Sequence, residues 1–180
     1  MTLFTFGHGT ATQETIAAIL HRAGIGLVVD VRIAPGSRRH PHVARSALEQ
    51  WLPDAGIEYR WDRRLGGFRR PAPDSPDVGW RNESFRGYAG WTRSEEFRRA
   101  TDALLADTER VPTTVMCSES LWWRCHRRLI ADVVVLLRAT PVVHVMHDGR
   151  DVEHVPTPTA RVADGVLVYD LEQTALPLDE

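Results

Sequence analysis

Short apolar runs and amphipathic segments alternate along most of the chain. Runs with the length of strands lie at residues 2–8, 25–32, 57–62, 112–118 and 141–146. Segments with apolar side chains along one helical face lie between or after them, at residues 12–24, 43–56, 94–107 and 125–139. This alternation predicts an α/β fold, a three-layer architecture in which an open, mostly parallel sheet carries helices on both faces.

The pattern also divides the chain. Residues 1–147 are expected to form a single α/β domain, which fits a length of 180 residues. Within this domain, the segment from about residue 63 to residue 92 is rich in glycine, proline, arginine and aromatic side chains, and we expect an irregular insertion there. Residues 148–180 are expected to form a C-terminal hairpin or arm.

Composition narrows the class of protein. The chain is 43% hydrophobic and 26% charged, which is typical of a folded domain, and its net charge of −2 gives no general reason to expect a nucleic-acid partner. All 22 basic residues are arginine, so catalysis through a Schiff base on a lysine is excluded. Two cysteines do not make a disulfide framework, and no apolar run could span a membrane. We therefore expect a cytoplasmic protein with reduced thiols, no membrane association and no cofactor.

Three of the predicted strands end in reactive groups. These ends are Gly7-His8-Gly9, Asp30-Val31-Arg32 with Ser37 shortly after, and Cys117-Ser118-Glu119. In open α/β sheets, ligands bind beyond the carboxyl ends of the strands. If the three strands are parallel neighbours, these groups meet at one edge of the sheet and form a site.

Each of these groups also has a plainer interpretation. His8 could simply cap a strand end. Asp30 and Arg32 point to the same side of a strand, so they could form an ion pair with each other rather than contact a ligand. Ser37 could bind a phosphate or lie in a solvated loop.

The stretch VMCSESLWWRCHRRLIAD, residues 115–132, gathers the most chemistry. Cys117 and Cys125 with His126 could hold zinc, with His144 or His147 as a fourth ligand, although the spacing matches no common zinc template. Either cysteine could instead be a nucleophile, or a small apolar side chain at a strand end.

Glu119 is the preferred general acid or base, because the loop after the strand lets it point into a cleft. Trp122 and Trp123 are adjacent in the same loop, so one of them is expected to be exposed to a partner or ligand.

Residues 59–99 interleave arginine with aromatic side chains. The segment includes Arg69, Arg70 and Tyr88 among many others. Arginine binds phosphate and aromatic faces stack on bases, so this pattern indicates a nucleic-acid surface. An insertion packed by its own aromatic side chains, with arginines stacked over them, explains the pattern equally well.

Several motifs together resemble a known family. FTFGHGT, LVVDVRIAPGSRR, LGGFRR, FRGYAGWTRSEEF and VMCSESLWWRCHRRLIAD, spread from about residue 4 to residue 145, are similar to the bacterial and archaeal family called domain of unknown function 488. The chain departs from that family's pattern at Gly9, where a serine is usual, and at Trp122-Trp123, where proline is more common. The resemblance places the family's motif residues at His8, Asp30, Arg32, Pro35, Ser37, Gly66, Gly67, Tyr88, Cys117, Glu119, Cys125, His126 and Arg127.

Some members of that family are similar to DNA glycosylases that act on modified pyrimidines. The resemblance thus implies a base-processing enzyme that flips its target into a pocket and hydrolyses the N-glycosidic bond, without a lysine-based lyase step. The candidate catalytic residues are Glu119, His8, Asp30, Cys117 and His126. The candidates for binding substrate or phosphate are Arg32, Ser37, Arg127, Tyr88, Trp122, Trp123, Arg69 and Arg70.

Two other interpretations of the sequence remain open. One is an enzyme that acts on a small anionic molecule through a cysteine nucleophile. The other is a non-catalytic module that binds nucleic acid or protein. Residue patterns alone specify neither the substrate nor the oligomeric state.

Overall fold

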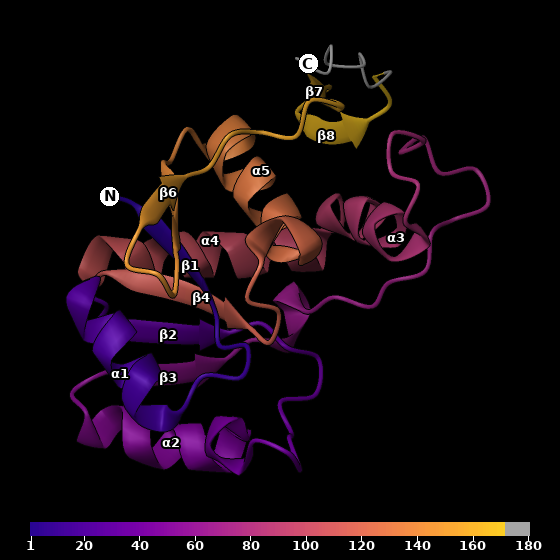
Figure 1. The fold of residues 1–180 in the computed structure, drawn as a ribbon. Coiled ribbons are helices and arrows are strands. Elements are labelled where there is room, and N and C mark those ends of the chain that lie inside the picture. The colour runs from indigo at the N-terminus through magenta and orange to yellow at the C-terminus, as the bar shows by residue number, and fades with distance from the viewer. Residues whose placement is uncertain (172–180) are drawn as a thin grey trace, which may run out of the picture.

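The computed structural model describes residues 1–171; the end of the predicted C-terminal hairpin or arm, residues 172–180, lies outside the described residues. Six strands form one sheet in the order β3-β2-β4-β1-β5-β6 (Figure 1). Their bounds are β1 Leu3–Gly7, β2 Leu27–Asp30, β3 Glu58–Trp61, β4 Thr113–Cys117, β5 Val142–Val145 and β6 Asp151–Glu153. The first five are parallel, and β6 runs antiparallel to β5. The predicted α/β fold with a mostly parallel sheet is confirmed.

Five α-helices cover the two faces of this sheet (Figure 1). Their bounds are α1 Gln13–Arg22, α2 Arg45–Asp54, α3 Glu83–Thr92, α4 Glu95–Arg110 and α5 Arg127–Arg138. Side chains alternate along each strand, so Leu27 and Val29 pack with α3, α4 and α5, whereas Val28 packs with α1 and α2. The result is the predicted three-layer arrangement, with one hydrophobic cluster on each side of the sheet.

The predicted irregular insertion at 63–92 is wrong in its last third. After the 3-10 turn Arg63–Leu65, a further helix, α3, begins at Glu83. Asn82 caps it, because its side-chain oxygen accepts hydrogen bonds from the backbone N–H groups of the second and third helical residues. Gly87 lowers helix propensity and obscures the pattern, but a Cβ there would lie 2.1 Å from the carbonyl oxygen of Arg69. Packing of its buried face against α5 and against the strand Val166–Tyr169 stabilises the helix despite this glycine.

The C-terminal part contains two hairpins. β6 pairs with β5, and a second hairpin of β7 Ala160–Ala163 and β8 Val166–Tyr169 packs against α3 and α5 (Figure 1). Buried Asp132 of α5 holds this segment by accepting four hydrogen bonds, from His154 Nε2, from the N–H and hydroxyl of Thr157, and from the Tyr169 hydroxyl. The segment is therefore attached to the domain through a buried carboxylate as well as through apolar contacts.

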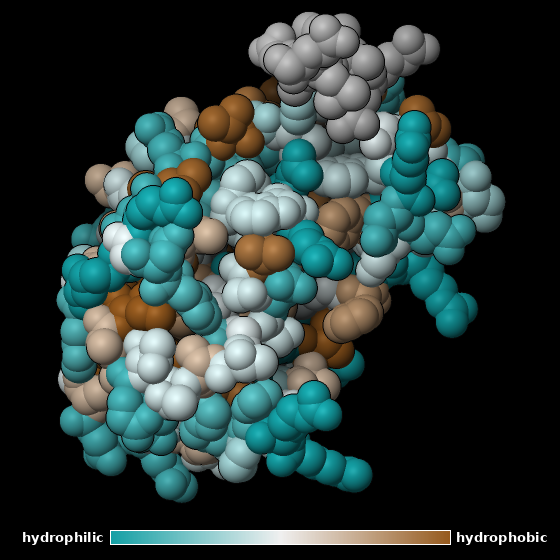
Figure 2. Space-filling model, in the orientation of Figure 1, coloured by the Kyte–Doolittle hydropathy of each residue, from teal (hydrophilic) through white to brown (hydrophobic). Residues whose placement is uncertain are grey.

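The visible surface is largely polar. Figure 2 shows hydrophobic side chains only in small separate patches on the face seen there. None of the described helices combines the length and apolar character that crossing a lipid bilayer requires.

Candidate active site

The sheet topology opens a crevice at the carboxyl end of β4. This strand lies between β1 and β2, and all three are parallel. The chain leaves β1 and β2 toward α1 and α2 on one face, but it leaves β4 toward α5 on the other face. Chains that diverge to opposite faces leave a gap above the strand ends, where open α/β sheets bind ligands. A cavity of about 590 Å³ lies there.

The cavity brings together residues that are far apart in the sequence. Of the predicted site residues, those lining it are His8, Arg32, Ser37, Cys117, Glu119 and His126, together with Cys125 from the possible metal set. The loop after β4 closes onto β1, since the His8 N–H donates to the Cys117 carbonyl at 3.0 Å. The three strand ends thus meet at a common cavity.

Arg32 and Asp30 form a buried ion pair at the wall of the cavity. Arg32 donates from Nε to Asp30 Oδ1 at 2.8 Å and from Nη2 to Asp30 Oδ2 at 2.5 Å, and Nη2 also reaches the Val43 carbonyl at 2.8 Å. The Tyr59 hydroxyl donates to Asp30 Oδ2 at 2.8 Å. Asp30 is fully buried and does not line the cavity, so it orients Arg32 rather than meeting a ligand.

Arg32 keeps one donor for a ligand. Its Nη1 donates to His8 Nε2 at 3.3 Å, which brings the guanidinium N–H groups with partners to four. Among the described residues the fifth N–H, on Nη1, has no partner. Because the side chain lines the cavity, this group can bind an anionic or carbonyl oxygen there.

His8 is held in one neutral tautomer. Its Nδ1 donates to the Gly9 carbonyl at 2.9 Å, and its Nε2 accepts from Arg32. Burial and the nearby charge of Arg32 lower the pKa of His8 to about 4. Near neutral pH His8 therefore carries no extra proton to give to a leaving group, and its role is to position Arg32.

Cys125 lines the cavity, and its sulfur lies close to the side chains of Arg127 and His126. Arg127 Nε donates to Cys125 Sγ at 3.3 Å, and His126 Nδ1 lies 3.6 Å from the same sulfur. Both cysteines are free thiols and mostly buried, with 8% of Cys117 and 4% of Cys125 exposed. The cysteines line the cavity, whereas Arg127 lies behind them.

The two thiols have opposite electrostatic environments. A hydrogen bond from Cys117, together with the charges of Arg127 and His126, holds the pKa of Cys125 well below its ordinary value, although burial opposes this. The pKa of Cys117 is raised well above its ordinary value by that hydrogen bond and by burial. The directions of these two shifts favour Cys125 over Cys117 as the thiol that ionises first.

Arg127 also fixes the loop that carries Glu119. Its Nη2 donates to the Glu119 carbonyl, and this contact passes directly over Gly7. A Cβ at Gly7 would lie 1.9 Å from that carbonyl oxygen, so only glycine allows the loop to cross β1 here. The Glu119 side chain lines the cavity, and its Oε1 accepts from the Leu121 N–H at 3.1 Å.

Cys117, Cys125 and His126 could share a soft metal ion, because their donor atoms lie within 4.8 Å of one another. The two residues suggested as a fourth ligand are engaged elsewhere: His144 bonds to Thr5 and His154, and His147 bonds to the Gly7 carbonyl. The Arg127 guanidinium against Cys125 opposes a further cation. We therefore assign no metal to this cluster.

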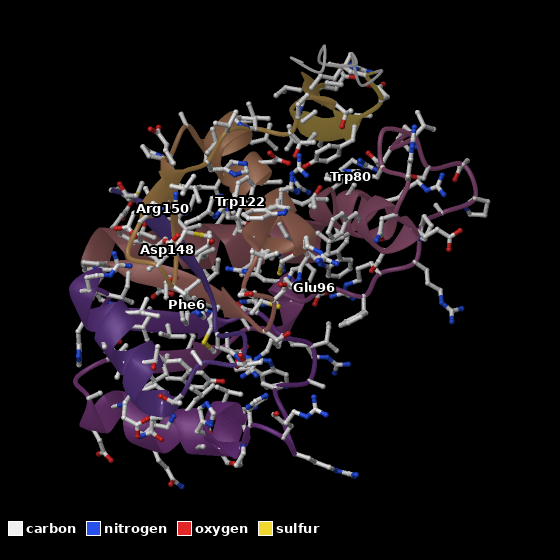
Figure 3. The ribbon with its side chains drawn as sticks, in the orientation of Figure 1. Phe6, Trp80, Glu96, Trp122, Asp148 and Arg150 are labelled. Carbon is white, nitrogen blue, oxygen red and sulfur yellow. The ribbon has the colours of Figure 1, made fainter. Side chains whose placement is uncertain are left out.

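The remaining predicted binding residues lie outside the cavity. The ring of Trp122 (Figure 3) stacks on His144 at a centroid distance of 4.0 Å, and Trp123 is 43% exposed, as expected for one of the pair. Buried Tyr88 donates to the Leu65 carbonyl at 2.6 Å. The guanidinium of Arg69 lies over the ring of Trp91, and exposed Arg70 does not line the cavity.

Much of the segment that alternates arginine and aromatic side chains packs on itself. Trp80, Tyr88 and Phe97 are buried, and Trp80 packs against Phe85. Arg60 and Arg64 pair with Asp62, Arg93 with Asp77, and Arg99 with Glu95. For these residues the structure agrees with the interpretation as an insertion stabilised by its own contacts.

Several cavity residues were not among the predicted site residues, namely His40, Phe68, Asn82, Phe85 and Arg124, although Phe68 and Phe85 belong to the predicted arginine and aromatic segment. Phe68 is the most unusual, because it is 90% exposed and its φ is +58°, a conformation that non-glycine residues rarely adopt. Phe68 directly follows Gly66 and Gly67, and paired glycines in a loop indicate a place where the backbone can approach a ligand closely. The others come from α3 and from loops, whose placement requires the tertiary structure.

Comparison with known proteins bears on the family and not on the activity. The model of the family described as "Domain of unknown function DUF488" matches residues 12–134, from the start of α1 into α5. The comparisons with curated proteins and with solved structures find no match. The family match covers more than half of the chain and includes Arg32, Cys117 and Cys125. The chain therefore belongs to the DUF488 family, as its motifs predicted.

Proposed function

We propose that this protein is an enzyme that acts on a small anionic molecule through a nucleophilic Cys125 thiolate. The observation that carries this proposal is the environment of Arg127. Its side chain is only 1% exposed, and among the described residues its partners are the Cys125 sulfur and the Glu119 carbonyl, with no carboxylate paired to it. Its Nε donates instead to Cys125 Sγ, at 3.3 Å.

A buried guanidinium needs a negative partner. Arginine stays charged in proteins, and an isolated buried charge costs several kcal/mol. The neighbouring sulfur is the group that can supply the charge, by ionising to a thiolate. Cys117 first, and then the charges of Arg127 and His126, lower the pKa of Cys125, and a thiolate is the nucleophilic form of cysteine.

The cavity suits an anionic substrate. Arg32 and Arg124 line it, and Glu119 supplies the one carboxylate that the described part of the chain places there. The unpartnered Nη1 N–H of Arg32 is positioned by Asp30 and His8, so it can bind a substrate oxygen without losing another contact. Its volume of about 590 Å³ lies in the usual range for small-molecule sites.

Covalent catalysis follows from this arrangement. The Cys125 thiolate attacks an electrophilic carbon or phosphorus, forms a bond to it through sulfur, and the leaving group departs with its electron pair. His126, adjacent to the sulfur, gives that group a proton. Glu119 then takes a proton from water, whose oxygen bonds to the same centre while the bond to sulfur breaks and the thiolate returns.

Alkylation tests the proposed nucleophile. Iodoacetamide should modify Cys125 rapidly well below pH 8, as located by peptide mass spectrometry. Cys117→Ser should keep this rapid reaction and Cys125→Ser should abolish it. A wild-type protein in which neither thiol reacts except at higher pH would overturn the proposal. Incubation with aryl phosphates and aryl esters that carry a carboxylate, followed by intact mass, should then reveal the covalent intermediate.

A second candidate function is supported by Phe68. An aromatic ring that is 90% exposed at the rim of a cavity can stack on a nucleobase, which a DNA glycosylase for modified pyrimidines would require. In this case Glu119 activates water. The test is incubation with duplexes that hold oxidised or methylated pyrimidines and chromatography of the released base, with Glu119→Gln as the inactive variant. Absence of both base release and binding would exclude it.

A further inference from the structure

The proposed nucleophile has a second thiol beside it that the proposed reaction uses only as a hydrogen-bond donor. Cys117 ends β4, and Cys125 precedes α5 after a loop that contains the one-turn 3-10 helix Trp122–Arg124. Both line the same cavity, and their sulfurs lie within 4.8 Å of each other. They are the only two cysteines in the chain.

We propose that Cys117 and Cys125 form a redox couple that reduces small hydroperoxides and closes to an intramolecular disulfide. This inference rests on the Cys125 thiolate assigned above, but it concerns a different reaction of the same site. It gives Cys117 the role of the resolving thiol.

The positions of the two sulfurs permit this. A disulfide requires an S–S distance of about 2.05 Å, so the two sulfurs, which lie within 4.8 Å of each other, need only a short further approach to form one. Both cysteines line the same cavity, and Cys117 has the largest influence on the pKa of the Cys125 thiol. The seven-residue loop between them is held at Glu119 by Arg127, so the chain need not rearrange as a whole.

The environment assigns a different role to each sulfur. Cys125 is paired with the Arg127 guanidinium, which stabilises a thiolate and also the negative charge that develops on a peroxide oxygen. Cys117 Sγ lies near the Ser118 hydroxyl, at 3.9 Å, a backbone group of Glu119 and the Cys125 sulfur, and among the described residues no guanidinium donates to it. Cys125 is therefore the attacking sulfur, and Cys117 reacts second.

The reaction balances with a hydroperoxide as the only oxidant. The Cys125 thiolate attacks the terminal peroxide oxygen, the O–O bond breaks, and the alkoxide leaves and takes a proton, giving a sulfenic acid and an alcohol. Cys117 then loses its proton to Glu119 and attacks the sulfenic sulfur. The S–O bond breaks, and hydroxide leaves and is protonated to water. The two thiols supply two electrons, and an external small thiol returns the pair to the reduced state.

Burial selects the size of the oxidant. With 8% and 4% of the two cysteines exposed, a protein disulfide cannot reach either sulfur, whereas a peroxide can enter the cavity. Hydrogen peroxide and short organic hydroperoxides are thus the expected substrates.

Intact-mass spectrometry tests the inference on the full chain. Reduced protein treated with one equivalent of hydrogen peroxide should lose about 2 Da and both free thiols, and a small thiol should reverse the change. Cys117→Ser should instead gain about 16 Da and form an adduct with dimedone, which traps sulfenic acids. Cys125→Ser should do neither at the same peroxide dose.

The outcomes separate the two proposals. If the wild-type protein gains oxygen rather than losing two hydrogens, or if Cys117→Ser behaves as the wild type does, Cys117 is not a resolving thiol. Rapid alkylation of Cys125 with no disulfide would overturn the redox couple and leave the nucleophile proposal standing. Slow alkylation of Cys125 would overturn both.

Discussion

Replacing Arg127 by methionine isolates the interaction on which the proposed chemistry depends. Methionine has a similar length and apolar stem, so it fills much of the space within α5 while it removes the charge and the Nε donor. The charge that stabilises the Cys125 thiolate is then lost. We expect the alkylation of Cys125 by iodoacetamide at pH 6 to slow by roughly 10- to 100-fold.

The magnitude follows from the contact. A hydrogen bond to a charged group contributes roughly 1.5–3 kcal/mol, and each 1.4 kcal/mol is about a factor of ten in the thiolate population. Coulomb's law sets an upper limit. Unit charges separated by the 3.3 Å between Nε and Sγ interact by about 5 kcal/mol at an effective dielectric constant of about 20. The hydrogen-bond value is the appropriate one, because the Coulomb value leaves out the cost of burying the two charges.

The assay measures the rate constant for alkylation of each cysteine between pH 5 and pH 9. Arg128→Met is the matched control, since Arg128 lies next along α5 but contacts Thr157 and the ring of Trp80. Circular dichroism establishes that both variants are folded. If Arg127→Met reacts within twofold of the wild type across this pH range while folded, Arg127 does not hold Cys125 as a thiolate, and the reasoning fails.

Three further predictions concern stability and the rim of the cavity. Asp132→Asn should lower the free energy of unfolding in urea by about 3–5 kcal/mol, because buried donors lose their acceptor, whereas Asp102→Asn at an exposed ion pair should cost less than about 1 kcal/mol. Burial lowers the pKa of His8 to about 4 and that of His144 to about 3, so below pH 6.5 the unfolded chain binds protons that the folded protein does not. Stability should therefore fall as the pH drops from 6.5 toward 4, by about 2 kcal/mol per histidine at pH 5, and a His144→Gln variant with an equally steep decline would contradict this. Phe68→Gly should change the free energy of unfolding by less than about 1 kcal/mol, because it relieves a positive φ but raises the entropy of the unfolded chain. If the Phe68 ring stacks on bases, the same change should weaken binding of single-stranded DNA by about 1–3 kcal/mol, as measured by fluorescence anisotropy.

Local sequence patterns predicted the positions of helices and strands more accurately than the tertiary contacts that these elements make. The first helix begins at Gln13 with Thr12 as its N-cap, and the buried strand Leu27–Asp30 lies where its apolar run indicated. The missed helix α3 shows the limit of this approach, because Gly87 and Gly90 weaken the local preference and packing against α5 compensates. Local preference is decisive only where tertiary contacts do not oppose it.

The candidate site shows the same division residue by residue. Reactive groups at strand ends could be found in the sequence, and His8, Arg32, Cys117 and Glu119 do meet at one cavity. The sequence could not show which of the polar residues can contact a ligand. Asp30 and Arg127 look as polar in the sequence as the residues that line the cavity, but in the structure their partners enclose them. Phe68 could not be told apart from the other aromatic residues of its segment, because exposure at the rim of a cavity leaves no periodic pattern in the sequence.

The sequence by itself determined the α/β class, the alternation of strands and helices, the absence of lysine chemistry and the family. These depend on side-chain periodicity and composition, which are local properties of the chain. Tertiary structure alone decided that β4 lies between β1 and β2 and that Cys117 lies within 4.8 Å of the Cys125 sulfur. It also decided that Arg127 is buried and donates to Cys125, with no carboxylate of residues 1–171 paired to it. Charge stabilisation and hydrogen bonding act over a few ångströms, and only the folded chain brings residues from separate segments to that distance.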